Sequence, residues 1–130
     1  MKLLMYHVGS FWYRPYEEIE KGKGIQFGES LLVWVQSEEQ DPNERVGILR
    51  KMVKNIRWLA KKHNLSSIIL HSFAHMGESK ADTGFTEDLI AEVASRLIER
   101  DYSVHIIPTG LNEFKMHVFG PSLAKVFKQL

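Results

Sequence analysis

Apolar and polar residues are arranged along this chain in blocks that predict five strands and three helices. The strand-like blocks are short, rich in β-branched and aromatic residues, and lie at 2–7, 30–36, 67–71, 104–108 and 113–118. The helix-like blocks repeat apolar residues every three or four positions and lie at 41–63, 86–100 and 122–128. A long irregular segment at 11–28 is expected to be either a flap or a broken hairpin.

Local signals mark both ends of the first predicted helix. Asp41 is expected to cap it, Pro42 fits the first helical position, and Glu44 occupies the reciprocal capping-box position. Asn64 after the last turn is typical of a left-handed C-terminal cap. The residues expected to face the core are Val46, Leu49, Val53, Ile56 and Ala60 in this helix. In the second helix they are Leu89, Ile90, Val93, Leu97 and Ile98, and in the third Leu123, Val126 and Phe127.

The order of these blocks indicates an α/β fold. Helical connections between strands are long enough for parallel crossovers, and the turn at 109–112 predicts one tight, hairpin-like return. We therefore expect a single compact domain over residues 1–130, with a mixed β-sheet of about five strands, two main helices and a short C-terminal helix.

Composition narrows the class of protein. Hydrophobic residues make up 44% of the 130 residues and charged residues 25%, which is the balance of an ordinary globular protein. No apolar run is long enough to span a bilayer, so a cytoplasmic location is expected. The chain has no cysteine, which excludes disulfides and thiolate chemistry. A net charge of +1 gives no global attraction to nucleic acid, so any such contact must come from a local basic patch.

The best candidate for a site follows the apolar strand at 67–71, where the chain reads Ser72-Phe73-Ala74-His75. Ligands of α/β sheets bind beyond the carboxyl ends of the strands, and this corner lies at such an end. The corner is therefore the expected place for a bound ligand.

Other chemistry in the same residues is less well supported. His71 and His75 are too far apart on an extended strand, roughly 13 Å, to share a metal ion, so His71 is expected to be a hydrogen-bonded sheet residue. Ser72, His75 and Asp82 could form a hydrolytic triad, but no nucleophile-elbow glycines flank the serine. Five cations on the first helix could meet phosphates or form a solvated face: Lys51, Lys54, Arg57, Lys61 and Lys62.

The chain resembles a known family over nearly its whole length. The succession MKLLMYH, SLLVWVQ, SSIILHSFAH, LIERDYSVHIIPTG and FKMHVFGPSLAKVF is similar to the editing domain of archaeal threonyl-tRNA synthetases, a relative of the D-aminoacyl-tRNA deacylases. The most specific elements are the Phe73-Ala74-His75 corner and the Pro108-x-Gly110 turn. The resemblance implies a D-aminoacyl-tRNA deacylase-like fold, commonly dimeric, that hydrolyses the ester between a wrong amino acid, serine in that family, and transfer RNA.

The resemblance also implies which residues form the site. Main-chain atoms of the corner, Ser72, Phe73 and Ala74, would hold the substrate amino acid together with the turn residues Thr109, Gly110 and Asn112. The assigned catalytic positions are His75, Glu113 and Lys125. The ester hydrolysis that the resemblance implies needs a positioned water and hydrogen-bond donors aimed at the oxyanion, and main-chain N–H groups at a strand end can supply the donors. His75 would then orient the substrate or the water. No sequence feature demands a metal or an organic cofactor. The implied partners are the acylated 3′ end of transfer RNA, a second copy of the chain, and the catalytic chain of a threonyl-tRNA synthetase.

Two positions depart from the family pattern. The family has a functional lysine soon after the turn glycine, but here Glu113 stands at that position, or Asn112 if the alignment shifts by one residue. The family has a glutamate where this chain has Lys125. This double replacement suggests that Glu113 and Lys125 form a reversed ion pair at the pocket mouth, the alternative being two unrelated surface charges.

Three functions remain open at this point. The chain could be an editing-type deacylase acting on a substrate such as seryl-tRNA(Thr), with hydrolase activity. It could be a catalytically weak relative that binds aminoacyl ends, amino acids or nucleotides, which the missing lysine favours. It could also be a module for dimerisation or transfer-RNA contact, which exposed aromatic residues at Trp12, Tyr13 and Tyr16 would favour.

Overall fold

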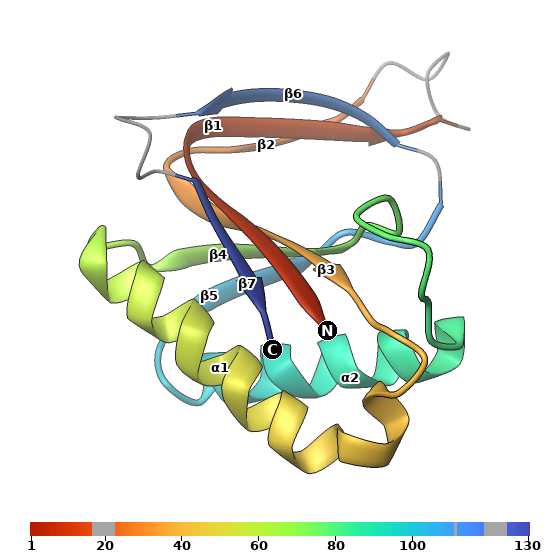
Figure 1. Ribbon diagram of the computed structural model, residues 1–130. Coiled ribbons are helices and arrows are strands. Elements are labelled where there is room, and N and C mark those ends of the chain that lie inside the picture. Colours follow the sequence, from red (N-terminus) through yellow and green to blue (C-terminus); the bar gives the residue numbers. More distant parts are fainter. Residues whose placement is uncertain (17–22, 111, 119–124) are drawn as a thin grey trace.

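The computed structural model describes residues 1–16, 23–110, 112–118 and 125–130, in which a seven-stranded mixed sheet carries two helices on one face (Figure 1). The strands are β1 (Lys2–Pro15), β2 (Ile25–Phe27), β3 (Ser30–Gln36), β4 (Ser67–Ser72), β5 (Ser103–Ile106), β6 (Asn112–Val118) and β7 (Lys125–Gln129). The helices are α1 (Arg45–Lys62) and α2 (Thr83–Ile98), and a short 3₁₀ helix, η2 (Asp41–Glu44), precedes α1. The expected α/β class with a mixed sheet and two main helices is confirmed.

The long first strand organises the sheet, because β1 has four antiparallel neighbours. Its first part pairs with β3 on one side and β7 on the other, and its second part pairs with β2 and β6. A register shift between Val8 and Ser10 marks the change of partners. In Figure 1 the strand turns there, so that its second part, β2 and β6 form a layer above the rest of the sheet.

For the segment 11–28, a flap or a broken hairpin was predicted, and the structure has the hairpin arrangement. Residues 11–15 continue β1, and β2 returns beside them, with Phe11 opposite Phe27. Residues 17–22 lie outside the described part of the chain. Tyr13 is buried in this layer, with 2% of its surface exposed, whereas Tyr16 is 62% exposed. Of the three aromatic residues whose exposure would favour an interface, Tyr13 therefore belongs to the core.

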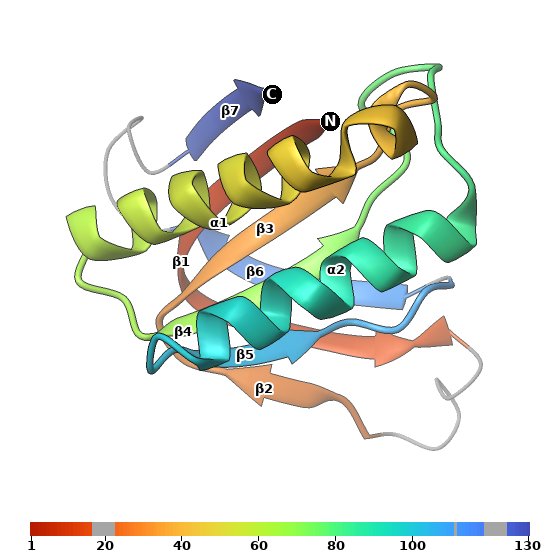
Figure 2. The same cartoon turned by 90° about the horizontal axis from the view of Figure 1, so that it is seen from below.

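β3, β4 and β5 are parallel neighbours, and α1 and α2 are the crossovers between them. Both helices cover the same face, as Figure 2 shows with the helices in front of the sheet. The predicted hairpin-like return after β5 is wrong, because β6 pairs with β1 and not with β5. The connection instead carries the chain from the main sheet to the second layer. Among the described residues, no helix is long and apolar enough to span a membrane.

Two cores form on the two faces of the main sheet. The larger lies under α1 and α2 and includes Met52, Ile56, Leu89 and Val93. The smaller lies between the main sheet and the second layer, and aromatic residues such as Phe11, Tyr13 and Phe114 pack into it. Side chains of β4 alternate between them: Ile68 and Leu70 belong to the larger core and Ile69 to the smaller. By the same alternation, Ser72 points to the helix side.

The predicted C-terminal helix at 122–128 is wrong, because residues 125–129 form β7, which pairs with β1 from Lys2 to Tyr6. Residues 119–124 lie outside the described part. A helix of this length has too few internal hydrogen bonds to be stable without tertiary contacts. The free edge of β1, in contrast, offers a backbone hydrogen-bond partner to each alternate residue. The pairing holds the segment extended although it leaves Phe127 52% exposed.

Local predictions at the helix ends were correct in part. Asn64 has φ 55°, which confirms the left-handed position after α1. Asp41 does not cap the helix; its buried carboxylate accepts hydrogen bonds from the Met1 amino group and from the N–H of Glu38. Val46 and Ile98, expected to face the core, are 80% and 55% exposed. Each lies at the edge of the apolar face of its helix and points partly to solvent.

Candidate functional site

The predicted corner lies at the carboxyl end of β4 and is held rigidly on one side. The N–H of Phe73 donates to the carbonyl of Val35 at 2.9 Å, which extends the pairing of β4 with β3 by one residue. The ring of Phe73 stacks on Trp34 with a centroid separation of 4.4 Å, and the imidazole of His75 packs edge-on against Phe73 at 5.0 Å. Phe73 therefore anchors the corner and does not line its opening.

A pocket of about 240 Å³ opens on the other side of the corner. Five predicted site residues line it: Ser72, Ala74, His75, Thr109 and Gly110. Within the part of the chain that the structure describes, the N–H groups of Ala74 and His75 form no hydrogen bond. These amides are therefore able to donate to an oxyanion or to a substrate carbonyl.

Five further polar residues, which the sequence analysis did not predict, line the pocket: Gln36, Ser37, Lys80, Thr83 and Thr86. Gln36 ends β3, Lys80 comes from the loop before α2, and the two threonines stand in the first turns of α2. The carboxylate of Asp82 accepts from the N–H of Gly84 and so caps α2, which gives Asp82 a structural role instead of a place in a triad. A helix N-terminus carries partial positive charge, so this wall of the pocket favours anionic or carbonyl groups.

A second hollow of about 310 Å³ adjoins the first, because Ser72 and Thr109 line both. Its other walls are mostly apolar and include Ile90, Ile106 and Pro108. The Thr109 hydroxyl donates to the carboxylate of Glu87 at 3.1 Å, at the boundary between the two hollows. A ligand with a small polar part and a larger apolar part could therefore occupy both.

The turn after β5 shapes this boundary. Gly110 has φ +133°, a conformation that residues with a Cβ rarely adopt. The side-chain amide of Asn112 donates to the carbonyls of Pro108 and Gly110 at 3.4 and 3.2 Å. Asn112 therefore braces the turn, and its amide is not among the groups that line the pocket.

The predicted ion pair between Glu113 and Lys125 is wrong. Glu113 pairs with Arg14 at 2.6 Å and stands opposite it in the β1–β6 ladder. Lys125 stands opposite Tyr6, eight positions earlier on β1. The two charges are separated because the C-terminal segment is a strand on the first part of β1, whereas β6 pairs with the second part. Neither residue lines the pocket at the corner.

His71 faces away from this pocket, into the smaller core, where its ring packs against Phe114 at 5.3 Å. Burial lowers the pKa of His71 to about 4, so the imidazole is neutral at physiological pH. Its Nδ1 atom has no hydrogen-bond partner in the described residues, in contrast to the predicted hydrogen-bonded role. Among those residues, no group of three or more His, Asp or Glu side chains could hold a metal ion.

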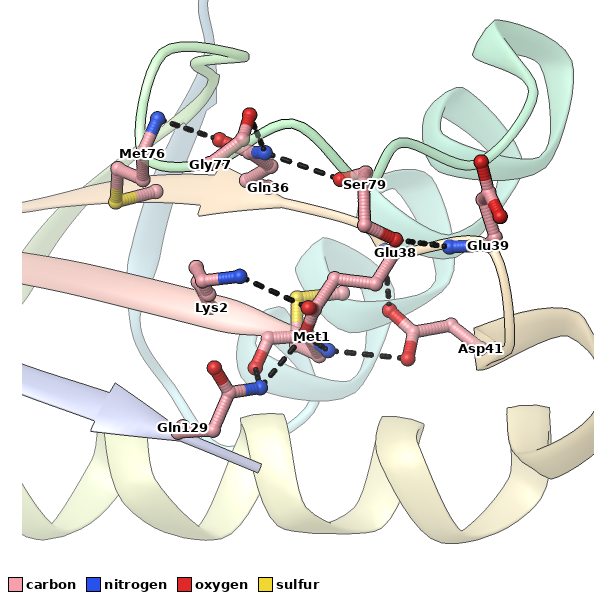
Figure 3. Close-up of polar contacts among 10 residues, drawn as sticks. All are labelled: Met1, Lys2, Gln36, Glu38, Glu39, Asp41, Met76, Gly77, Ser79 and Gln129. Atoms are coloured by element: carbon pink, nitrogen blue, oxygen red, sulfur yellow. Dashed lines mark hydrogen bonds and ion pairs between the residues drawn. The ribbon is translucent and has the colours of Figure 1, made fainter.

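The loop that closes the pocket is attached to the sheet by Gln36, which is 2% exposed (Figure 3). Its side-chain amide donates to the carbonyls of Gly77 and Ser79 and accepts from the N–H of Met76, at 2.8, 3.1 and 2.6 Å. A polar residue at the end of the apolar run SLLVWVQ was the available sequence signal for this role.

A charged network lies beside Gln36 and anchors the end of β3 (Figure 3). The carboxylate of Glu38 accepts from Lys2 at 2.8 Å, from the amino group of Met1 at 2.5 Å and from Gln129 at 2.6 Å. The hydrogen bond from Lys2, followed by that from the amino group, lowers the pKa of Glu38 to about 2. The network thus joins β1, β7 and the segment after β3 at one point.

Replacing Gln36 by methionine is expected to lower the free energy of unfolding by about 2 kcal/mol, because one N–H and two carbonyls of the loop lose their partner. The pocket wall should loosen as well. Chemical denaturation followed by tryptophan fluorescence measures the change. Gln26→Met on the exposed surface of β2 is the matched control and should stay within about 0.5 kcal/mol of the parent chain. Equal stability of the two variants would show that Gln36 does not hold the loop.

Comparison with known proteins connects this geometry to a family. A model of the archaea-specific editing domain of threonyl-tRNA synthetase matches residues 1–130. The chain belongs to this editing-domain family. The resemblance found in the sequence is thereby confirmed, as is the connection of the chain to transfer-RNA editing.

Individual relatives of the editing domain are distant in sequence. The chain is 22% identical over 138 residues to a threonine–tRNA ligase of Methanosphaera stadtmanae and 24% identical over 139 residues to one of Thermococcus sibiricus. Each alignment covers 100% of the chain but 22% of the relative, so the chain spans about a fifth of the length of these ligases. A threonine–tRNA ligase of Methanocaldococcus jannaschii is 25% identical over 115 residues, which is 88% of the chain and 18% of the ligase.

A solved structure shares the fold of the editing domain. The c-Myc DNA unwinding element binding protein superimposes with a TM-score of 0.69, covering 100% of this chain and 99% of its own. The two sequences are 13% identical, so the likeness concerns the fold alone.

Proposed function

We propose that this editing domain is a deacylase that hydrolyses the ester between an amino acid and the 3′ end of a mischarged transfer RNA. The pocket at the end of β4 carries this proposal, because it brings Ser72, Ala74, His75, Thr109 and Gly110 together in a chain that matches the editing-domain family throughout. Its volume, about 240 Å³, is below the range of about 300–1,000 Å³ typical of drug-sized ligands. A small acyl group such as seryl suits such a space.

The reaction needs little from the side chains. A water oxygen bonds to the ester carbonyl carbon, the bond from that carbon to the ribose oxygen breaks, and the proton that the water loses ends on the ribose oxygen. The N–H groups of Ala74 and His75, which have no hydrogen-bond partner among the described residues, would stabilise the negative charge on the carbonyl oxygen. Hydroxyl groups of Ser72 and Thr83 would bind the polar groups of the amino acid.

Lys80 offers a cation at this site. The family has a functional lysine soon after the turn glycine, and this chain has at that position Glu113, which pairs with Arg14, or Asn112 if the alignment shifts by one residue. Lys80 lines the pocket from the loop before α2. Its ammonium group could bind the terminal phosphate or ribose of the transfer RNA in place of the missing lysine.

A deacylation assay with seryl- and threonyl-charged transfer RNA tests the proposal. The parent chain should release serine, and His75→Ala should be at least about tenfold slower, because His75 lines the pocket and a positioned acid or base contributes about 100-fold or more. His117→Ala, which removes an exposed histidine on β6, is the control and should retain the parent rate. If the parent chain releases no amino acid from either substrate, the deacylase proposal fails.

A catalytically weak binding domain is the second candidate function. The separation of Glu113 from Lys125 favours it, because neither replacement restores a charge at the pocket. In this case the chain would retain aminoacylated ends or free amino acids without turnover. Equilibrium binding of a non-hydrolysable seryl-adenosine analogue, in the absence of deacylation, would identify it. A homodimer and contact with a synthetase catalytic chain stay predictions for either function.

A further inference from the structure

A groove of about 450 Å³ is lined by residues of α1 and of the C-terminal end of α2 and the residues just after it. Figure 2 shows these two helices side by side on one face of the sheet. We call this groove the basic groove, because six of the eight residues that line it are cations: Arg50, Lys54, Arg57, Lys61, Arg96 and Arg100. The four on α1 follow one another at steps of four, three and four, which places them along one face of the helix. Val53 and Trp58 form the apolar part of its lining.

The groove holds six cations, although the net charge of the whole chain is only +1. The positive charge is therefore concentrated at this surface. Of the six, Arg96 has an ion pair, with Glu92 at 3.5 Å. The other five have none within the described residues. The Nε atom of Arg57 is buried and has no hydrogen-bond partner in the described part of the chain. Like charges at these helical spacings repel, so an anion in the groove would relieve an unfavourable arrangement.

The shape of the groove favours a polyanion over a single small anion. From Arg50 to Lys61 the cations extend about 16 Å along α1. This length matches several consecutive phosphates of a nucleic-acid strand. Trp58 adds a flat ring that is 47% exposed, with Lys62 and Lys128 over it at 5.1 and 5.3 Å. An aromatic ring among phosphate-binding cations is a combination suited to a base or ribose beside its backbone.

We propose that the basic groove binds the sugar–phosphate backbone of RNA, and that it holds the body of the transfer RNA whose acylated end enters the pocket. The second part rests on the proposed function. Both sites lie on α2: Thr83 at its first turn lines the pocket, and Arg96 near its last turn lines the groove. Thr83 and Arg96 are thirteen positions apart on the helix, about 20 Å along its axis. A single-stranded 3′ end of a few nucleotides can span this distance.

Two charge-matched variants test the groove. Lys54→Gln/Arg100→Gln removes two exposed cations of the groove, and Lys23→Gln/Lys51→Gln removes two exposed cations outside it. Binding of uncharged transfer RNA is measured by fluorescence anisotropy between 50 and about 300 mM salt, a range in which phosphate contacts weaken steeply. The groove variant should bind about tenfold or more weakly at about 0.1 M salt, with a log–log salt slope reduced by about two.

The control variant should bind within about twofold of the parent chain at the same salt. Equal weakening in the two variants, or none in the groove variant, would overturn the proposal. A loss of binding to phosphatidylserine vesicles in the groove variant, with unchanged transfer-RNA binding, would also overturn it and indicate a membrane surface instead. Far-UV circular dichroism confirms that both variants are folded.

The outcomes separate this inference from the proposed function. If the parent chain binds uncharged transfer RNA through the groove but releases no amino acid, the groove stands and the deacylase proposal fails. If it deacylates normally while the groove variant binds as the parent does, the deacylase stands and the groove fails.

Discussion

Replacing Ala74 by phenylalanine is expected to abolish deacylation while the domain stays folded. Ala74 is half-buried and forms a wall of the pocket at the end of β4. A phenyl ring in a space of about 240 Å³ would occupy the position of the acyl group. Displacement of a reacting group by as little as about 1 Å can cost about 100-fold in rate, so a loss of at least that size is expected. Initial rates of serine release from charged transfer RNA measure it.

Two further variants make this result specific to the pocket. Ala81→Phe places the same ring in the pocket from the loop before α2 and should have the same effect. Ala91→Phe makes the same change on the exposed side of α2 and should keep the parent rate. Retention of the full rate in both pocket variants would mean that the ester is hydrolysed elsewhere.

His71→Phe is expected to remove much of the acid sensitivity of the fold between pH 6.5 and about 4.5. The pKa of His71 is about 4 in the folded chain and 6.5 in an unfolded one, because burial disfavours the charged ring. The unfolded state therefore binds the proton more readily, and stability falls as the pH falls from 6.5 towards 4. The full effect is about 3 kcal/mol. Phenylalanine keeps the ring contact with Phe114 and has no proton to bind.

Urea unfolding at pH 7, 5.5 and about 4.5 measures this effect. These pH values lie above the range in which protonation of Glu38 lowers the stability. The lowered pKa of Glu38 contributes stability above pH 4.5 that is lost as the pH falls towards about 2. The free energy of unfolding of His71→Phe should still fall with falling pH, but with a smaller slope, because burial also lowers the pKa of His63 and His105. His117→Phe, at an exposed position, should keep the parent slope. An unchanged slope in His71→Phe would show that the folded chain accommodates the charged ring.

Some of the residues that line the pocket could be predicted from the sequence and others could not. Ser72, Ala74 and His75 could be predicted because they directly follow an apolar strand, and such strand ends are where α/β sheets bind ligands. Thr109 and Gly110 followed from the family resemblance. Gln36 and Lys80 could not be found in this way, because they reach the pocket from another strand and from a loop whose position depends on hydrogen bonds between distant segments.

The two errors with the largest consequences come from one segment. Residues 125–129 have the spacing of an amphipathic helix, yet they form β7 on the open edge of β1. The ion pair between Glu113 and Lys125, predicted from the double replacement, is absent because β7 places Lys125 opposite Tyr6, whereas Glu113 stands opposite Arg14. Backbone hydrogen bonds to a free strand edge outweigh a weak helical preference in so short a segment.

By itself the sequence determined the α/β class, the two long helices, the central strands, the corner after β4 and the family, because each depends on local periodicity or on a continuous motif. Only the tertiary structure decided the turn of β1, the pairing of β7, the partners of Glu113 and His71, and the joining of α1 and α2 into one basic groove. These features depend on contacts between residues far apart in the chain. Such contacts are decided by which strand edges and helix faces remain available after the local elements have formed.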